Sequence, residues 1–126
     1  MKNIKKLGIW LDHYNAYLME LVNDTIMTKS VVSDISNQEA EFNFYKGEKL
    51  IHKKEQHLQL SFYKKLGEII KEYHEVVLFG PTDAKNELLN LLNRDHLFEN
   101  IKIEVKQSDQ MTESQRHDFV RKYFKK

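Results

Sequence analysis

The sequence predicts a mixed α/β fold in which helices cover a five-stranded sheet, and three observations lead to this prediction. The chain opens with three short apolar segments separated by turn residues, a pattern typical of an antiparallel meander. The rest of the chain alternates helical and extended patterns, as expected when helices pack against a sheet. No linker composition and no internal repeat divides the 126 residues, so we expect a single domain over residues 1–126.

Three strands are predicted in the amino-terminal part. Residues 7–11 (LGIWL) form a continuous apolar run, as expected of a strand that is covered on both faces. Residues 16–22 (AYLMELV) follow the turn cluster DHYN, and this short spacing favours an antiparallel hairpin. Residues 25–35 are rich in β-branched side chains, which favours a third strand.

A long loop is predicted next. Residues 36–56 (SNQEAEFNFYKGEKLIHKKEQ) have no clean periodicity, and they contain one glycine, several amides and many charges. We expect an exposed, flexible loop that holds at most a short helix. Loops of this length inside a compact domain often carry function.

Helices and strands then alternate. Residues 57–75 place apolar side chains at helical spacing and predict an amphipathic helix, and residues 76–79 (VVLF) predict a short buried strand. The sequence GPTDAK follows, where we expect Thr82 to cap a helix and Asp83 to lie in its positively polarised first turn. Residues Ala84, Leu88, Leu91 and Leu92 are expected to face the core.

The carboxy-terminal part adds one strand and one helix. Residues 101–107 alternate apolar and charged side chains, which predicts a half-exposed strand at an edge of the sheet. Thr112 and Gln115 have the spacing of a capping box at a helix start. The resulting order β-β-β-loop-α-β-α-β-α is that of the ribonuclease-H-like arrangement, with helices on the faces of the sheet.

Composition excludes several classes of site. The chain has no cysteine, which excludes disulfides, a thiol nucleophile and cysteine-bound metals. No stretch approaches the length of a membrane span and the amino-terminal apolar run is too short for a signal peptide, so we expect a cytoplasmic protein without a membrane partner. No P-loop, dinucleotide-binding, serine-hydrolase or zinc motif occurs, and no cofactor is expected.

Two basic stretches point to an anionic partner such as RNA, although the net charge is only +1. Solvated helix faces are the competing interpretation. Lys85, which follows the Gly-Pro corner, could hold one phosphate at a helix start or simply lie in solvent. The other candidates are Lys46, Lys49, Lys53 and Lys54 in the central stretch, and Arg116, Arg121, Lys122, Lys125 and Lys126 in the last one.

Carboxylates at strand ends support an alternative. Asp12, Asp83 and Asp109 each follow a predicted strand, and such ends can converge in a ribonuclease-H-like sheet. Converging carboxylates would bind Mg²⁺ for hydrolysis of a phosphodiester. Asp is also common in turns and caps, so no metal site is the preferred expectation. Among the six histidines, only His13 stands beside another candidate group.

The ordered elements resemble a known group of proteins. The matching features are GIWLDHYNAYLMEL near the start, the long loop before an amphipathic helix, VVLFGPTDAKNELLNLL, and the ending DQMTESQRHDFVRKYF. They span nearly the whole chain. On these features the chain resembles the middle domain of archaeal and eukaryotic peptide chain release factors and of Pelota, and more closely the small bacterial proteins called "translational machinery protein".

The resemblance implies a place in translation. In the release factors the corresponding loop carries a Gly-Gly-Gln that promotes peptidyl-tRNA hydrolysis, whereas this chain has only Gly47 there and no Gly-Gly-Gln anywhere. We therefore expect a non-catalytic, ribosome- or RNA-associated domain. A Mg²⁺-dependent nuclease is the alternative. A protein-interaction module is a third, in which strand 101–107 pairs with a second copy or with a partner.

Overall fold

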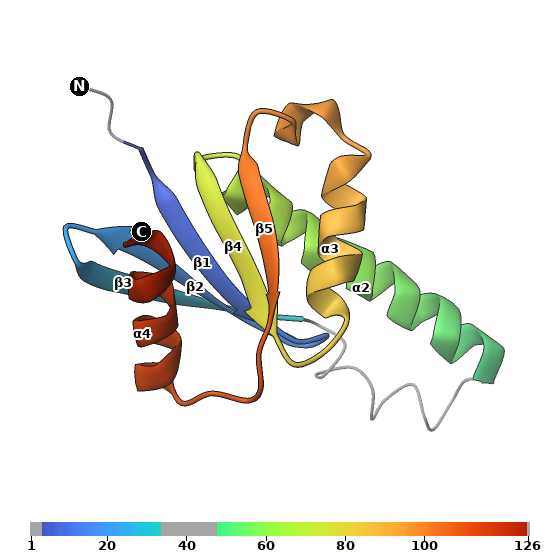
Figure 1. Ribbon diagram of the computed structural model, residues 1–126. Coiled ribbons are helices and arrows are strands. Elements are labelled where there is room, and N and C mark those ends of the chain that lie inside the picture. Colours follow the sequence, from blue (N-terminus) through green and yellow to red (C-terminus); the bar gives the residue numbers. More distant parts are fainter. Residues whose placement is uncertain (1–3, 34–47, 126) are drawn as a thin grey trace.

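The structure is a computed structural model that describes residues 4–33 and 48–125, with side chains except in residues 48–57 (Figure 1). Its order confirms the predicted alternation of strands and helices. The elements are β1 (Lys6–Leu11), β2 (Asn15–Val22), β3 (Thr25–Val32), α2 (Glu48–Ile70), β4 (Glu75–Gly80), α3 (Ala84–Asn93), the short 3₁₀ helix η1 (His96–Phe98), β5 (Lys102–Gln107) and α4 (Glu113–Phe124).

The five strands form one mixed sheet in the order β3-β2-β1-β4-β5. The first three strands pair antiparallel as the predicted meander, and β1 pairs parallel with β4, which pairs parallel with β5. The predicted five-stranded mixed sheet is therefore confirmed. β5 lies at an edge, as its alternating sequence predicts.

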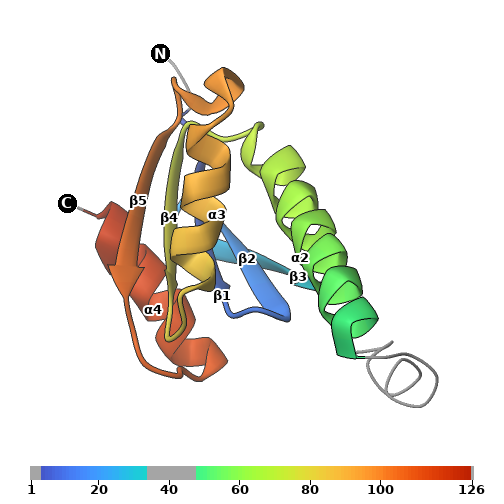
Figure 2. The same cartoon turned by 90° about the vertical axis from the view of Figure 1, so that its right-hand side faces the viewer.

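Helices cover both faces of the sheet (Figure 2). α2 and α3 lie side by side on one face, and α4 lies on the other. The core under α2 and α3 is the larger, with buried side chains from β1, β4 and both helices. The core under α4 is smaller and is built on Trp10, Met19, Val77, Phe79 and Val120.

Gly8 determines how closely α4 approaches the sheet. A Cβ atom added at Gly8 would collide with the Val120 side chain. Val120 is fully buried, so the glycine leaves the space that this helix residue fills. The close approach presses one face of α4 against β1 and turns the charged face outward.

The chain turns sharply at Gly80, the last residue of β4. Gly80 has φ +152° and an added Cβ would collide with the Leu11 carbonyl oxygen, so only glycine fits there. The Thr82 hydroxyl accepts a hydrogen bond from the Ala84 N–H at 3.2 Å. The N-cap position belongs to Asp83, however, and its side chain makes no capping hydrogen bond, so the expected division of roles between these two residues is corrected.

The predicted loop 36–56 is wrong in its second half, because α2 already begins at Glu48. Residues 48–56 lack apolar periodicity but consist mostly of good helix formers. Extending a helix that is already nucleated is far less costly than starting one, so the amphipathic segment continues backwards through them. Residues 36–47 lie outside the described residues. α2 also ends at Ile70 rather than at residue 75.

Within residues 4–33 and 48–125, no helix is both long enough and apolar enough to cross a bilayer.

Candidate nucleic-acid interface

The outer face of α4 is the first candidate, and its position is well determined by the sequence. The Thr112 hydroxyl accepts the Gln115 N–H at 3.2 Å, and the Gln115 side chain accepts the Thr112 N–H at 2.9 Å, so the predicted capping box is confirmed. Phe119 stacks on Phe79 with ring centroids 4.2 Å apart. With one side of the helix anchored, the basic residues of α4 lie on its flanks and outer side.

Arg116 is engaged inside the protein. Its guanidinium lies 4.1 Å from the centroid of the Tyr17 ring and 5.7 Å from that of Trp10. It also donates a hydrogen bond to the Met111 carbonyl at 2.7 Å. Cation–π stacking and this hydrogen bond hold the side chain over the sheet, so the main role of Arg116 in the structure is to cover the aromatic residues beneath α4.

Arg121 joins α4 to the turn between β2 and β3. Its Nε donates to the Asp24 carbonyl at 3.1 Å, and one terminal nitrogen lies 3.5 Å from the Asp118 carboxylate. Asn23 and Asp24 both have positive φ, as expected in a tight two-residue hairpin turn. The side chain of Arg121 is still 42% exposed, so it can also face a ligand.

A hollow of about 310 Å³ lies between the end of α4 and this turn. Lys6, Arg121 and Lys125 contribute three cations to its lining, and Asp24 contributes one carboxylate. Lys6 also lies over the Phe124 ring, 5.9 Å from its centroid. Lys122 is exposed on the same helix. We call Lys6, Arg121, Lys122 and Lys125 the basic cluster.

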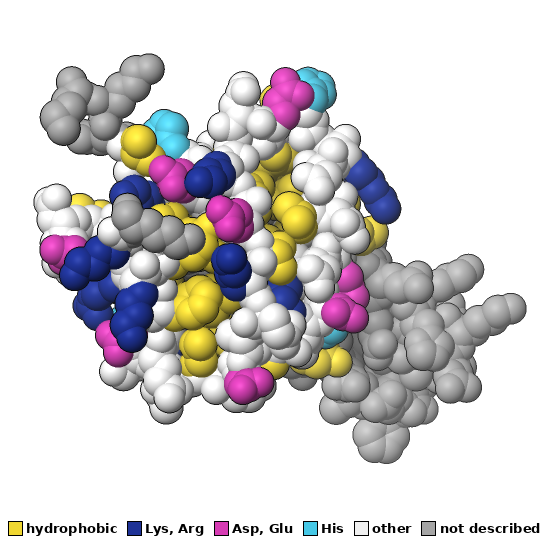
Figure 3. Space-filling model, in the orientation of Figure 1, with side chains coloured by type: hydrophobic (Ala, Val, Ile, Leu, Met, Phe, Trp, Pro, Cys, Tyr) yellow, Lys and Arg dark blue, Asp and Glu magenta, His cyan; other side chains and the backbone are white. Residues whose placement is uncertain are grey.

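Lys and Arg side chains gather near α4 on the surface of the molecule, with some Asp and Glu side chains among them (Figure 3). Figure 3 shows dark-blue Lys and Arg side chains gathered where Figure 1 places α4. Such a concentration of exposed cations is the usual footprint of a phosphate-binding surface. Lys6 was not among the sequence-predicted residues, and no sequence signal reveals it, because only the pairing of β1 within the sheet brings it to α4.

The two basic stretches do not form one surface. Lys49, Lys53 and Lys54 stand on the first half of α2, which lies on the opposite face of the sheet from α4 (Figure 2). Lys46 lies outside the described residues. The described central lysines and the carboxy-terminal cations therefore belong to helices on different faces of the sheet (Figure 2), and a joint contact with RNA stays a prediction.

Lys85 does not lie in solvent. Its side chain is 2% exposed, and its amino group donates to the Thr82 carbonyl at 2.5 Å. The aliphatic stem packs in the core under α3 while the amino group turns back to the start of its own helix. The expected position in solvent is therefore wrong, and the amino group has a partner within the protein.

The three aspartates lie at different turns of the structure. The Asp12 carboxylate accepts the N–H groups of Tyr14 and Asn15 at 2.8 and 2.7 Å and so closes the β1–β2 turn. Asp83 occupies the N-cap of α3, and Asp109 is exposed after β5. In the described part of the chain, no three His, Asp or Glu side chains are grouped so that they could hold a metal ion. The nuclease alternative thus has no carboxylate cluster there.

A polar cluster that the sequence did not reveal lies at the carboxyl end of β1. Glu87 accepts the Tyr63 hydroxyl at 2.7 Å, and its other oxygen lies 3.3 Å from His13 Nε2. Gln59 donates to the His13 carbonyl at 3.1 Å. Burial is the largest cause that raises the pKa of Tyr63, and the hydrogen bond to Glu87 adds to it. The cluster ties α2, α3 and the β1–β2 turn together.

Comparisons with known proteins identify the fold. No family model matches the chain, and no curated protein matches it. The structure is similar to the Pelota protein of Thermoplasma acidophilum, with a TM-score of 0.63 and 13% identity over 93% of this chain and 32% of that one. Archaeoglobus fulgidus Pelota also gives 0.63, with 9% identity over 98% and 32%.

The archaeal translation termination factor aRF1 gives a TM-score of 0.55 and 14% identity over 96% of this chain and 39% of that one. This chain spans about a third of the length of each of the two Pelota proteins. At such low identity the similarity concerns the fold alone. The chain has the fold of the middle domain of Pelota and aRF1, which confirms the expected resemblance at this level, while membership of the bacterial family stays a prediction.

Proposed function

We propose that this chain is a non-catalytic domain that associates with the ribosome or its RNA as part of the translation machinery. The observation that carries the proposal is the basic cluster: Lys6, Arg121 and Lys125 line one hollow between β1 and α4, and Lys122 is exposed on the same helix. The middle-domain fold supports the same direction, since one protein that shares it is a translation termination factor.

The chemistry of the cluster suits phosphate groups. Lysine and arginine neutralise backbone phosphates without reading the base sequence. Lys122 and Lys125 are exposed, and neither has a side-chain partner among the described residues. They are therefore available to an incoming polyanion. The absence of Gly-Gly-Gln from the sequence is the reason that the proposal includes no hydrolytic step.

The proposal includes a cytoplasmic location and a chain that acts as one domain. The central lysines Lys46, Lys49, Lys53 and Lys54 remain candidates for a second RNA contact, and the last three belong to α2, on the opposite face of the sheet from α4 (Figure 2). Arg116 belongs to the proposed surface mainly as a support for α4. Pairing of two copies through the β5 edge is a separate proposal that light scattering tests directly.

Sedimentation of a cell lysate through a sucrose gradient tests the main proposal. The protein is expected to travel with ribosomes at low salt and to stay at the top at high salt. The variant Lys122→Gln/Lys125→Gln removes two exposed cations and should shift the protein towards the top. Its matched control is Lys29→Gln/Lys65→Gln, which removes the same charge from exposed residues outside α4.

Binding to a single-stranded RNA fragment adds a quantitative test. Losing two phosphate contacts should lower the slope of log affinity against log salt by about 1.4. The control variant should keep the wild-type slope. The proposal is wrong if the protein stays at the top of the gradient at low salt. It is also wrong if the α4 variant keeps the wild-type slope of log affinity against log salt.

A further inference from the structure

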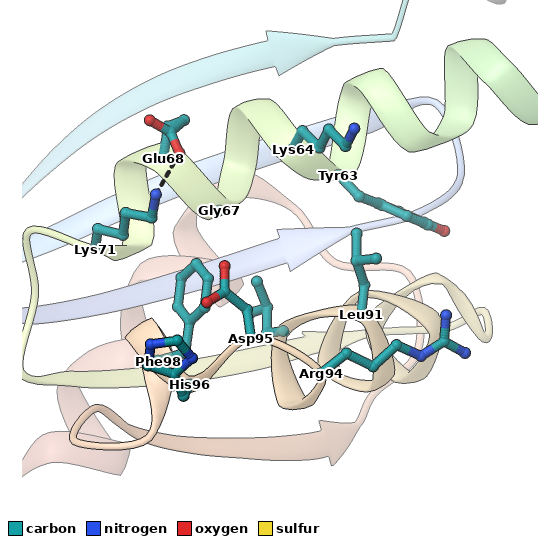
Figure 4. A pocket seen from close by; sticks show the side chains of 11 residues that line it. Tyr63, Lys64, Gly67, Glu68, Lys71, Leu91, Arg94, Asp95, His96 and Phe98 are labelled. Atoms are coloured by element: carbon teal, nitrogen blue, oxygen red, sulfur yellow. Dashed lines mark hydrogen bonds and ion pairs between the residues drawn. The ribbon is translucent and has the colours of Figure 1, made fainter.

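A groove runs between α2 and α3, on the face of the sheet opposite the basic cluster (Figure 4). It consists of two hollows of about 650 and 410 Å³ that share Tyr63, Leu91 and Arg94 in their linings. Along α2 it extends from Gln59 to Glu68, a rise of about 14 Å, and it reaches Lys71 just after the helix. The groove is long, and each of its two walls is one face of a helix. This shape is typical of a site for an elongated ligand.

The floor of the groove is apolar. Phe98 and Leu92 are 7% and 3% exposed and line it from the η1 and α3 side. Gly67 faces them from α2, where an added Cβ would lie 3.4 Å from both side chains. A larger residue at position 67 would therefore fill the space, and the glycine keeps the floor open at the cost of some helix propensity.

The acidic side chains of the groove are all engaged within the protein. Glu87 accepts the Tyr63 hydroxyl, and Glu68 lies 2.7 Å from the Lys71 amino group. The Asp95 carboxylate caps η1 by accepting the Leu97 N–H at 2.9 Å. Of these three, only Glu68 is paired with a cation, whereas Glu87 and Asp95 keep their negative charge because their donors are neutral.

Two cations of the groove have no such partner. Lys64 on α2 and Arg94 just after α3 are exposed, and within the described residues neither side chain has a hydrogen bond, an ion pair or a ring contact. They extend from opposite walls of the groove (Figure 4). The groove thus combines an apolar floor with one cation on each rim that has no direct partner among the described residues.

We propose that this groove binds an acidic amphipathic helix of a partner protein. Its apolar face would cover Leu91, Leu92 and Phe98, and its carboxylates would meet Lys64 and Arg94. A helix laid into an apolar groove is a recurrent mode of protein recognition. RNA fits less well, because sugar and phosphate groups gain nothing from an apolar floor. This site is independent of the RNA contact proposed for α4.

A designed peptide of about 14 residues tests the proposal, since that length spans the groove as a helix. Leucines at i, i+3, i+4 and i+7 form its apolar face, and glutamates flank them. A second peptide carries lysine in place of every glutamate. Fluorescence anisotropy of labelled peptide measures affinity, and amide chemical shifts at Gly67, Leu91 and Phe98 locate the binding.

We expect the acidic peptide to bind the wild-type chain and to shift those three resonances. The variant Lys64→Glu/Arg94→Glu should bind it at least about tenfold more weakly and should gain affinity for the lysine peptide. Lys122→Glu/Lys125→Glu makes the same charge change on α4 and should leave peptide affinity unchanged. Both variants alter exposed side chains, and far-UV circular dichroism checks that they fold.

Four results would overturn the proposal. The first is that the acidic peptide does not bind, and the second is that it binds wild type and the groove variant with equal affinity. The third is that it changes amide chemical shifts only in α4. The fourth is that an RNA oligonucleotide displaces the peptide and changes the chemical shifts of the same groove residues. The last result would assign the groove to RNA. Failure here leaves the gradient experiment on α4 unaffected, because this experiment measures peptide binding through Lys64 and Arg94 and the gradient measures ribosome association through Lys122 and Lys125.

Discussion

The hydroxyl of Tyr63 donates a 2.7 Å hydrogen bond to the Glu87 carboxylate and thereby joins α2 to α3. Tyr63 is 4% exposed, so its ring is part of the core and its oxygen lies at the edge of that core. Glu87 also contacts His13 in the β1–β2 turn. One side-chain hydrogen bond therefore links two helices that are adjacent on the sheet, at the end of the groove between them.

Replacing Tyr63 with Phe should lower the free energy of unfolding by about 1 kcal/mol. The variant keeps the ring and its packing but loses the hydroxyl that Glu87 accepts. Because the Glu87 side chain is 47% exposed, water can replace the lost donor, and this keeps the loss of stability small. Urea denaturation measures it. The control Tyr14→Phe, at a ring that is 43% exposed, should change stability little.

The same pair of residues predicts a dependence on alkaline pH. Burial, followed by Glu87, raises the pKa of Tyr63 above its ordinary value of 10.0. Above about pH 10 the unfolded state loses this proton first, so it binds fewer protons than the folded state and stability falls as pH rises. The advantage of wild type over Tyr63→Phe should be constant below pH 10 and shrink above it. A difference that stays constant up to pH 11 would contradict this assignment.

Replacing Gly80 with alanine should lower the stability of the protein, whereas replacing Gly67 with alanine should raise it. Gly80→Ala requires a strained φ of +152° and brings a methyl group against the Leu11 carbonyl, so we expect a loss of at least about 2 kcal/mol of stability. Gly67→Ala adds a methyl group at 3.4 Å from two side chains and raises helix propensity by up to about 1 kcal/mol.

Thermal unfolding of both glycine variants provides the measurement. A Gly67→Ala variant as unstable as Gly80→Ala would show that the groove floor cannot accept even one methyl group. Equal stability of Gly80→Ala and wild type would contradict the turn geometry at the end of β4.

The buried lysine gives a further prediction. Lys85→Met keeps most of the packed volume and removes the donor to the Thr82 carbonyl, so stability should fall by about 1.5 kcal/mol or less. Lys85→Ala also loses the buried stem and should cost at least about 2 kcal/mol. RNA affinity of Lys85→Met should equal that of wild type. Weaker RNA binding by a stably folded Lys85→Met would return this residue to the list of phosphate contacts.

Much of the fold was predictable because it depends on local patterns. The alternation in residues 101–107 identified an edge strand, and Thr112 with Gln115 identified the start of α4. The boundary of α2 was not predictable in the same way. Residues 48–56 carry no apolar stripe, and their helical state depends on their continuity with the packed segment that follows.

The candidate sites were predicted less well than the fold. Arg121 and Lys122 were recognised as cations near the end of the chain, but Lys6 joins them only because β1 lies beneath α4. Lys85 looked like a surface residue in sequence and is buried in the structure. The type of a charged residue indicates what it can bind, whereas the packing of its neighbours decides whether a ligand can reach it.

The sequence by itself determined the order of strands and helices, the absence of cysteine chemistry and the absence of Gly-Gly-Gln. These properties reside in residue identity and in spacing along a few turns or strands. Only the tertiary structure decided that α2 and α4 lie on opposite faces of the sheet, and that Tyr63 meets Glu87 beside an open groove. Such relationships join residues far apart in the chain, and they arise when apolar faces are buried together.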